Sequence, residues 1–426
     1  MTIKKLFLTL AAAASAAVPA AAQTAAGGIP SELTWEDCAA IALRNNPALS
    51  AQRRTIEQAK YSYLAGLNSV YPQLGLSHSF SRSGGQGASP SDRWSAGISA
   101  SETLFNLKTY SSIRSSKLGF EKAEEDYLNQ SAALRQTLAN AFLALIYAQE
   151  NLKAQTRILE IREQNAKLIK LKYDSGMESR GNMMYSAALA EQAKADLAKA
   201  GRSVEMARRD LLAAMGTADY SPVTAKGTLE IPDMRLDTAG IRARLDGIPQ
   251  VRSQEKSLET LKERMLSAKF DAAPTLTATQ GVGWSAGHEF PGSRSWSFGF
   301  SLNLPIFSNG PTYYAENTRA ASAALKAGED TLRSLKLSLE NNIVTSYYGF
   351  LNARDTAGSI AAVFGANEER YKESQIQYMA GQISYIDLEN IEQSLVDSQL
   401  NQLNFKKNAN SAKIAVENLL GVGLGQ

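Results

Sequence analysis

The stretch Trp94-Ser95-Ala96-Gly97-Ile98-Ser99 has a counterpart later in the chain, Trp296-Ser297-Phe298-Gly299-Phe300-Ser301. Further landmarks also return, with an offset of 202 residues in the first part of the unit and 205 in the second: Pro47 and Pro249, Pro72 and Pro274, Gly176 and Gly381. Landmarks that recur in one order over a long stretch indicate an internal repeat, which constrains the whole fold. The chain is therefore predicted to consist of two copies of one structural unit.

Each copy contains a segment in which large apolar side chains alternate with serine and glycine. Hairpins are expected at about 72–105 and about 274–307, with a glycine- and serine-rich loop from Ser81 to Pro90 in the first. Alternation over about ten residues is typical of a transmembrane barrel strand, which has lipid on one side and water on the other. Trp94 and Trp296 are predicted at the membrane–water interface, which tryptophan favours. Taken alone, the pattern fits an ordinary soluble hairpin with one wet face equally well.

Long helices are expected after each hairpin. Residues 108–173 and 312–378 contain no proline, and about 65 residues of continuous helix span roughly 100 Å. A return helix follows each, at 181–215 and 384–420, so each copy ends in a helical hairpin. Positions seven apart are mostly apolar along both long helices, which indicates coiled-coil packing: Leu138, Leu145, Leu152, Leu159, Ala166 and Tyr173 in the first, and Ile343, Phe350, Ala357, Phe364, Tyr371 and Tyr378 in the second.

The ends of the chain and the joint between the copies carry signals of their own. Lys4 and Lys5, an apolar stretch to Val18, and Ala20-Ala21-Ala22 follow the order of a removable secretory signal. The joint contains Pro222, Gly227 and Pro232, as a connector would. The predicted division is a signal at 1–22, a first repeat at 23–216, a connector at 217–240 with a short strand at 228–231, a second repeat at 241–421, and a tail at 422–426.

Composition argues against several classes of function. The chain of 426 residues has one cysteine, two histidines and a net charge of +3. One cysteine permits no internal disulfide, and two histidines argue against a histidine-based metal site or a serine–histidine–aspartate triad. The nearly balanced charge lacks the basic footprint of a nucleic-acid-binding protein. The sequence also contains no phosphate-binding loop or dinucleotide motif, so we expect no enzyme activity, no cofactor, no bound metal and no nucleic-acid partner.

Three local sequences resemble those of a known family. They are the opening Leu33-Thr34-Trp35-Glu36-Asp37, the strand entry Tyr71-Pro72-Gln73-Leu74, and a turn in which Tyr378 and Gly381 precede Ile386-Asp387-Leu388. The same order of helices, β-hairpin and helical hairpin occurs twice. On these features the chain resembles the TolC-type outer-membrane efflux and secretion channels over nearly its whole mature length.

This resemblance implies a mainly α-helical fold with membrane β-strands. Three subunits would share one twelve-stranded β-barrel, with four strands from each, and a long α-helical barrel would extend from it through the periplasm. The implied function is a passive exit duct in the outer membrane, serving a tripartite efflux pump or a type I secretion system. The implied partners are further copies of the chain in a homotrimer, a periplasmic adaptor, an inner-membrane transporter and outer-membrane lipid. From the residues alone, the alternative is a periplasmic coiled-coil scaffold that does not enter the membrane.

The resemblance also places functional residues at the tips of the helical hairpins. The implied aperture residues are Arg180, Asn182, Tyr378, Asp387, Glu389 and Asn390, and the implied adaptor contacts are Gly176, Ser179, Gly381 and Ser384. The chain departs from the family pattern at three of the tip positions. Ile383 stands where an arginine is frequent, and Asn182 and Asn390 stand where acids are usual. We therefore expect Arg180 to supply the missing positive charge, near Asp387 or Glu389.

Overall fold

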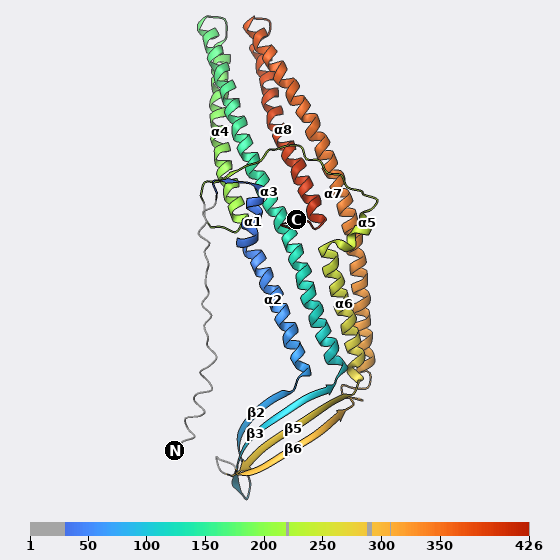
Figure 1. Cartoon of the computed structure of the whole chain (residues 1–426). Helices are drawn as coiled ribbons and strands as arrows, with labels where there is room; N and C mark the ends of the chain where they lie inside the picture. The colour runs from blue at the N-terminus through green and yellow to red at the C-terminus, as the bar shows by residue number, and fades with distance from the viewer. Residues whose placement is uncertain (1–29, 219–220, 288–291, 307, 426) are drawn as a thin grey trace, which may run out of the picture.

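The computed structural model describes residues 30–218, 221–287, 292–306 and 308–425. The molecule is long and narrow, with a four-stranded sheet at one end and the tips of two helical hairpins at the other (Figure 1). Short helices, a β-hairpin and a long helical hairpin follow one another twice along the chain. The duplication expected from the sequence is therefore present. The predicted signal at 1–22 lies outside the described residues.

One hairpin from each repeat contributes to a single antiparallel sheet. Its strands are β2 (Gln73–Gly85), β3 (Ala88–Phe105), β5 (Thr275–Ala286) and β6 (Ser293–Asn303). They lie in the order β2-β3-β5-β6, so each repeat supplies one edge strand and one inner strand. Within the described residues, no further strand pairs with the outer edge of β2 or of β6. The sheet is therefore open at both sides.

The first hairpin lies at the predicted position, but its strands are longer and its loop is shorter than predicted. Ser81 to Pro90, expected as a loop, is mostly strand, and the chain turns at Gly87, whose φ of 85° suits glycine. Strand pairing joins backbone groups and needs no apolar side chain, so a sequence of glycine and serine can continue it. Across this extension, Nε of Arg82 lies 3.5 Å from Oδ1 of Asp92. The prediction of a long loop is therefore wrong, because the lack of core-forming residues there does not end the pairing.

The strand register places the large side chains of the sheet on one face. One row across the four strands is apolar and the next is small and polar: Leu76, Ile98, Val282 and Trp296 in the first, and Ser77, Gly97, Gly283 and Ser295 in the second. Leu76 is 76% exposed and Trp296 is 77% exposed, because no described element covers the apolar face. The alternation in the sequence therefore becomes one apolar face and one small, polar face.

Two helical hairpins carry the chain away from the sheet. The first consists of α3 (Leu107–Asp174) and α4 (Arg180–Ala214), and the second of α7 (Tyr313–Met379) and α8 (Tyr385–Leu419). Each end lies one residue from its predicted position, because glycine, serine and proline mark helix ends locally. In the described part of the chain, no helix has both the length and the apolar character needed to cross a membrane.

The predicted heptad row is present from Ile343 to Tyr378 in α7 and in part of α3. The row in α7 is buried apart from the half-buried Phe364: Ile343, Phe350, Ala357, Tyr371 and Tyr378. In α3, Leu138 and Leu145 are fully buried, but nearer the tip the buried residues are neighbours of the predicted row: Ile158, Arg162, Asn165 and Ile169. A straight helix drifts by about 20° per heptad, so a different line of side chains comes to face the partner helices.

The helices form a wall one layer thick. Along the half nearer the sheet, α2 (Pro47–Leu67) packs on α3, α3 on α6 (Pro249–Lys269), and α6 on α7. Nearer the tips, α4 packs on α3, α3 on α8, and α8 on α7. The two orders leave α2 and α4 at one side of the wall and α7 at the other. Short turns complete these segments: η1 (Asn68–Val70), α5 (Ile241–Arg244), η2 (Leu245–Gly247) and η3 (Phe270–Ala272).

The connector joins the two repeats near the middle of the molecule. There β1 (Glu32–Leu33), just before α1 (Trp35–Asn45), pairs in parallel with β4 (Thr224–Ala225). The strand predicted at 228–231 is not formed. β1 ends after two residues and offers no further backbone groups to pair with. Leu229 instead packs into the largest apolar cluster, which includes Leu138 and Phe142.

Candidate functional site at the hairpin tips

The tips of both helical hairpins lie at the end of the molecule opposite the sheet (Figure 1). Each turn contains a glycine with positive φ, 76° at Gly176 and 72° at Gly381, a conformation that is costly for other residues. Ser179 and Ser384 cap the return helices, because each hydroxyl accepts a hydrogen bond from the backbone N–H three residues later. The four residues predicted as adaptor contacts are thus the residues that shape the turns.

The side chain of Tyr378 reaches from the second hairpin to the first. Its hydroxyl donates a hydrogen bond of 2.9 Å to Oε2 of Glu178. Oε1 of Glu178 accepts bonds from Nδ2 of Asn182 at 2.7 Å and from the backbone N–H of Ser179 at 3.0 Å. Nζ of Lys172 donates to the carbonyl oxygen of Tyr378 at 2.8 Å and lies 3.8 Å from the centre of its ring. We call Lys172, Glu178, Asn182 and Tyr378 the tip cluster.

The central bond of the tip cluster needs a protonated tyrosine and an ionised glutamate. Burial raises the pKa of Tyr378, and its hydrogen bond to Glu178 acts in the same direction. Burial opposes the ionisation of Glu178, but hydrogen bonds from Ser179, Asn182 and Tyr378 outweigh it and lower the pKa of the carboxyl group. Donor and acceptor are thus each held in the form that the bond requires.

The other predicted aperture residues do not join the tip cluster within one chain. Arg180 and Asn390 are exposed, and Glu389 is half-buried. The carboxylate of Asp387 accepts hydrogen bonds from the hydroxyl of Ser384 at 2.6 Å and from its N–H at 3.1 Å, which lower the pKa of Asp387. Among the described residues, the ion pairs found on α4 do not include Arg180. The expected contact of Arg180 with Asp387 or Glu389 is therefore not made inside a single chain.

Sequence reasoning missed Glu178 and Lys172. The family pattern places an acid at Asn182, whereas the acid of this chain stands four residues earlier, in the turn, and reaches the same place by binding Asn182. Its position directly before the helix cap Ser179 was the available signal, because carboxylates are favoured near the start of a helix. Ile383, at the position where the family often has arginine, is half-buried against the apolar cluster around Tyr378.

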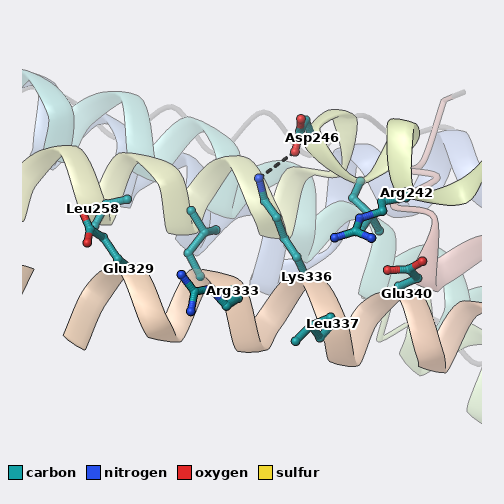
Figure 2. A pocket seen from close by; sticks show the side chains of 10 residues that line it. Arg242, Asp246, Leu258, Glu329, Arg333, Lys336, Leu337 and Glu340 are labelled. Atoms are coloured by element: carbon teal, nitrogen blue, oxygen red, sulfur yellow. Dashed lines mark hydrogen bonds and ion pairs between the residues drawn. The ribbon is translucent and has the colours of Figure 1, made fainter. Parts of the chain in front are cut away.

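An open groove of about 420 Å³ lies far from the tips, between η2, α6 and α7 (Figure 2). Lys336 reaches across it to Asp246 at 2.7 Å and to Glu255 at 2.9 Å, and these bonds raise the pKa of the lysine. The charged residues that line the groove are balanced in sign: Arg242, Arg333 and Lys336 against Asp246, Glu329 and Glu340. No lining residue is a histidine, cysteine or serine.

A sheet with one exposed apolar face, joined to long helical hairpins, defines the subunit of a membrane channel with a helical extension. The family model described as "Outer membrane efflux protein" matches residues 39–217 and 241–422. The chain belongs to this family. The resemblance inferred from the turn and strand sequences is therefore confirmed.

Relatives match the chain over most of its length. The cobalt-zinc-cadmium resistance protein CzcC of Cupriavidus metallidurans is 21% identical over 290 residues, which cover 68% of each chain. Outer membrane protein OprJ of Pseudomonas aeruginosa is 23% identical over 409 residues, which cover 89% of this chain and 81% of OprJ. The probable outer membrane lipoprotein SilC of Salmonella typhimurium is 23% identical over 399 residues, which cover 90% of this chain and 84% of SilC.

Solved structures of outer-membrane channels have the same fold. CusC matches with a TM-score of 0.82 at 18% identity, over 91% of both chains. The open state of the MtrE channel of Neisseria gonorrhoeae matches with a TM-score of 0.80 at 21% identity, over 91% of this chain and 89% of MtrE. With the family match, these findings identify an outer-membrane efflux channel subunit with a periplasmic helical extension. Its family and its fold neighbours are channel proteins and not enzymes.

Proposed function

We propose that three copies of this chain close into one passive duct through the outer membrane and the periplasm. The observation that carries the proposal is a sheet with two open edges, one apolar face and one small, polar face. Unpaired backbone groups are costly in lipid, so β6 of one copy would pair with β2 of the next until the barrel closes. The apolar face would then contact lipid, and the serine and glycine face would line a bore filled with water.

The helical wall supports the same closure. α2 and α4 lie at one side of the wall and α7 at the other, in the same order as the edge strands β2 and β6. On α2, Tyr61 is 66% exposed and Leu64 is 41% exposed. On α7, Leu337, which lines the groove of Figure 2, is 56% exposed. Contact between α2 of one copy and α7 of the next would cover apolar side chains on both.

The hairpin tips would form the periplasmic aperture. The bond between Tyr378 and Glu178 holds the two hairpins of one copy together, and opening the aperture would require it to break. Such a bond suits a gate because it is specific in geometry yet contributes only about 1.5–3 kcal/mol. The remaining residues proposed to act at the aperture stand at or near the same turns and could meet neighbouring copies: Arg180, Asn182, Asp387, Glu389 and Asn390.

A periplasmic adaptor would dock on the turns. Gly176 and Gly381 fix their shape, and beside them Met177 is 70% exposed and Met379 is 60% exposed. Exposed apolar side chains at the end of a long helical hairpin suit a protein partner. Ser179 and Ser384 would lie within the same contact. The adaptor would connect the duct to an inner-membrane transporter, which would supply the energy that a passive duct lacks.

The proposal is tested by recording from the purified full-length protein in planar bilayers and by measuring its mass in detergent. Discrete conductance steps from a particle of three chains are the expected result. A monomer that stays soluble without detergent and gives no conductance would refute the duct and favour the periplasmic scaffold. Trp296→Ser is a useful control, because it removes a large side chain from the proposed lipid face and should weaken insertion without narrowing the bore.

A further inference from the structure

A polar cluster lies buried between the two helical hairpins, away from the tips. Arg162 and Asn165 come from α3, Tyr371 from α7 and Glu392 from α8, and each is less than a tenth exposed. Nη1 of Arg162 lies 2.9 Å from Oε1 of Glu392. Among the ion pairs of the described residues, this is the one in which both side chains are less than a tenth exposed. Tyr371 packs there in an apolar cluster with Ile169.

Hydrogen bonds extend this ion pair across three helices. Nδ2 of Asn165 donates to Oε2 of Glu392 and, at 3.0 Å, to the hydroxyl of Tyr371. Nη2 of Arg162 donates to Oε1 of Gln393 at 2.6 Å. The network therefore ties the first hairpin, through α3, to both helices of the second. Oε1 of Glu392 takes part in the ion pair alone, and Oε2 accepts the hydrogen bond from Asn165.

Stability alone does not explain a buried ion pair at this place. Moving two charges into a protein interior costs several kcal/mol, and well-packed apolar residues of similar volume often stabilise the fold as well or better. Burial raises the pKa of Glu392, although Arg162 and the bond from Asn165 act in the opposite direction. The best-attested use of such buried polar groups is to fix the register of packed helices.

A device that fixes register is needed between these hairpins. Ridges of apolar side chains repeat every three or four residues, so two long helices pack nearly as well after a slip of one turn, about 5.4 Å. A slip of that size would break the 2.9 Å bond between Tyr378 and Glu178 at the tip. From Arg162 to the end of α3 at Asp174 there is about 18 Å of helix, so a shift at the cluster is carried to the tip.

We propose that Arg162 and Glu392 are positioning residues that hold the second hairpin against the first in one axial register. They set the alignment in which Tyr378 meets Glu178, so the two hairpins can part at the tip and rejoin in the same place. The inference rests on the proposed aperture and deepens it: the tip cluster supplies the contact that breaks, and the buried pair determines where that contact forms again.

The test replaces the ion pair by apolar side chains in the full-length protein, with Arg162→Met and Glu392→Leu together. The matched control is Arg135→Met with Glu417→Leu, because Arg135 and Glu417 also join α3 to α8, at 2.6 Å, but are each more than a tenth exposed. All variants carry Cys38→Ser, which removes the one native cysteine.

Register is read by chemical cross-linking between introduced cysteines. Arg157 on α3 lies 2.6 Å from Glu368 on α7, so cysteines at these two positions report the native register. Cysteines at Arg157 and Lys372, one helical turn further along α7, report the slipped register. A short thiol-specific cross-linker is added to each purified variant, and the melting temperature of each is measured in parallel.

The proteins with the native ion pair and the control variant should cross-link mainly in the native register, with a low yield of the slipped cross-link. The apolar double variant should give about a tenfold higher yield of the slipped cross-link, the change produced by losing about 1.4 kcal/mol of preference, with an unchanged or higher melting temperature. A slipped yield that stays at the control level, or a melting temperature well below it, would overturn the proposal. The assay needs no pore, so failure of the bilayer experiment would refute the duct and leave this result standing.

Discussion

Replacing Tyr378 by phenylalanine removes a single hydroxyl group from the tip cluster. That hydroxyl donates a 2.9 Å hydrogen bond to Glu178 across the two hairpins. Bonds to charged groups contribute about 1.5–3 kcal/mol, and the larger values apply when the remaining partner is left unpaired. Oε2 of Glu178 would lose this bond, but Glu178 is only half-buried, so water can replace the hydroxyl and the lower value applies. We therefore expect Tyr378→Phe to destabilise the closed tip by about 1.5 kcal/mol in each copy.

A change of about 1.4 kcal/mol alters an equilibrium tenfold. If the copies open one at a time, each tip should open about ten times more often, and concerted opening of three copies would multiply the effect further. The assay is the open probability of single channels in planar bilayers. Tyr185→Phe is the matched control, because Tyr185 lies on α4 near the same tip but is 50% exposed. An open probability in Tyr378→Phe equal to that of the control would refute the role of the tip cluster.

An added charge should have different effects on the two faces of the sheet. Leu76→Arg places a charge on the apolar face, which costs about 2–4 kcal/mol in lipid, and should prevent membrane insertion. Ser77→Arg places it on the small, polar face, so this variant should insert and shift the reversal potential toward anions. Acid should open the aperture, because the folded chain lowers the pKa of Glu178. The ionised Glu178 stabilises the closed tip fully above pH 4.5, the ordinary pKa of a glutamate, and this stabilisation is lost as the pH falls through the lowered pKa. Open probability in Glu178→Gln should not respond in this way. Gly216 and Gly176 share a φ of 76°, but a Cβ would meet backbone at 2.6 Å only at Gly216, so Gly216→Ala should lower the melting temperature more than Gly176→Ala. The first expectation fails if both arginine variants insert, and the second fails if Glu178→Gln keeps the pH response. The third fails if Gly216→Ala and Gly176→Ala have equal melting temperatures.

The features predicted well from the sequence are those specified by local signals. Proline opens α2 and α6 at their first residue, and glycine with serine sets both hairpin turns, so the helix bounds follow from single residues. The two faces of the sheet follow from the alternation of apolar and small residues, because successive side chains of a strand point to opposite faces. Because each signal occurs twice, an error in one copy is exposed by the other.

The features that were missed depend on partners far away in the sequence. β4 forms at Thr224–Ala225 because these residues lie beside β1 and pair with it, and nothing in the sequence at 228–231 carries that information. The first β-hairpin continues through Ser81 to Pro90 because its two strands continue to pair, whatever side chains they carry. Glu178 escaped notice because its partner Tyr378 is 200 residues away and the family pattern directs attention to Asn182.

The engagement of Asp387 decides which acid Arg180 can meet in an assembled channel. Asp387 forms a reciprocal cap with Ser384, and drawing its carboxylate away would break its hydrogen bonds with the hydroxyl and the N–H of Ser384. Glu389 does not belong to this reciprocal cap and is half-buried near the same turn. We therefore expect Arg180 of one copy to pair with Glu389 of a neighbour rather than with Asp387. In a double-mutant cycle on open probability, Arg180→Gln should couple to Glu389→Gln and not to Asp387→Asn. Asp387→Asn should instead lower the melting temperature. Coupling to Asp387→Asn alone would show that the cap at Ser384 breaks when the copies assemble.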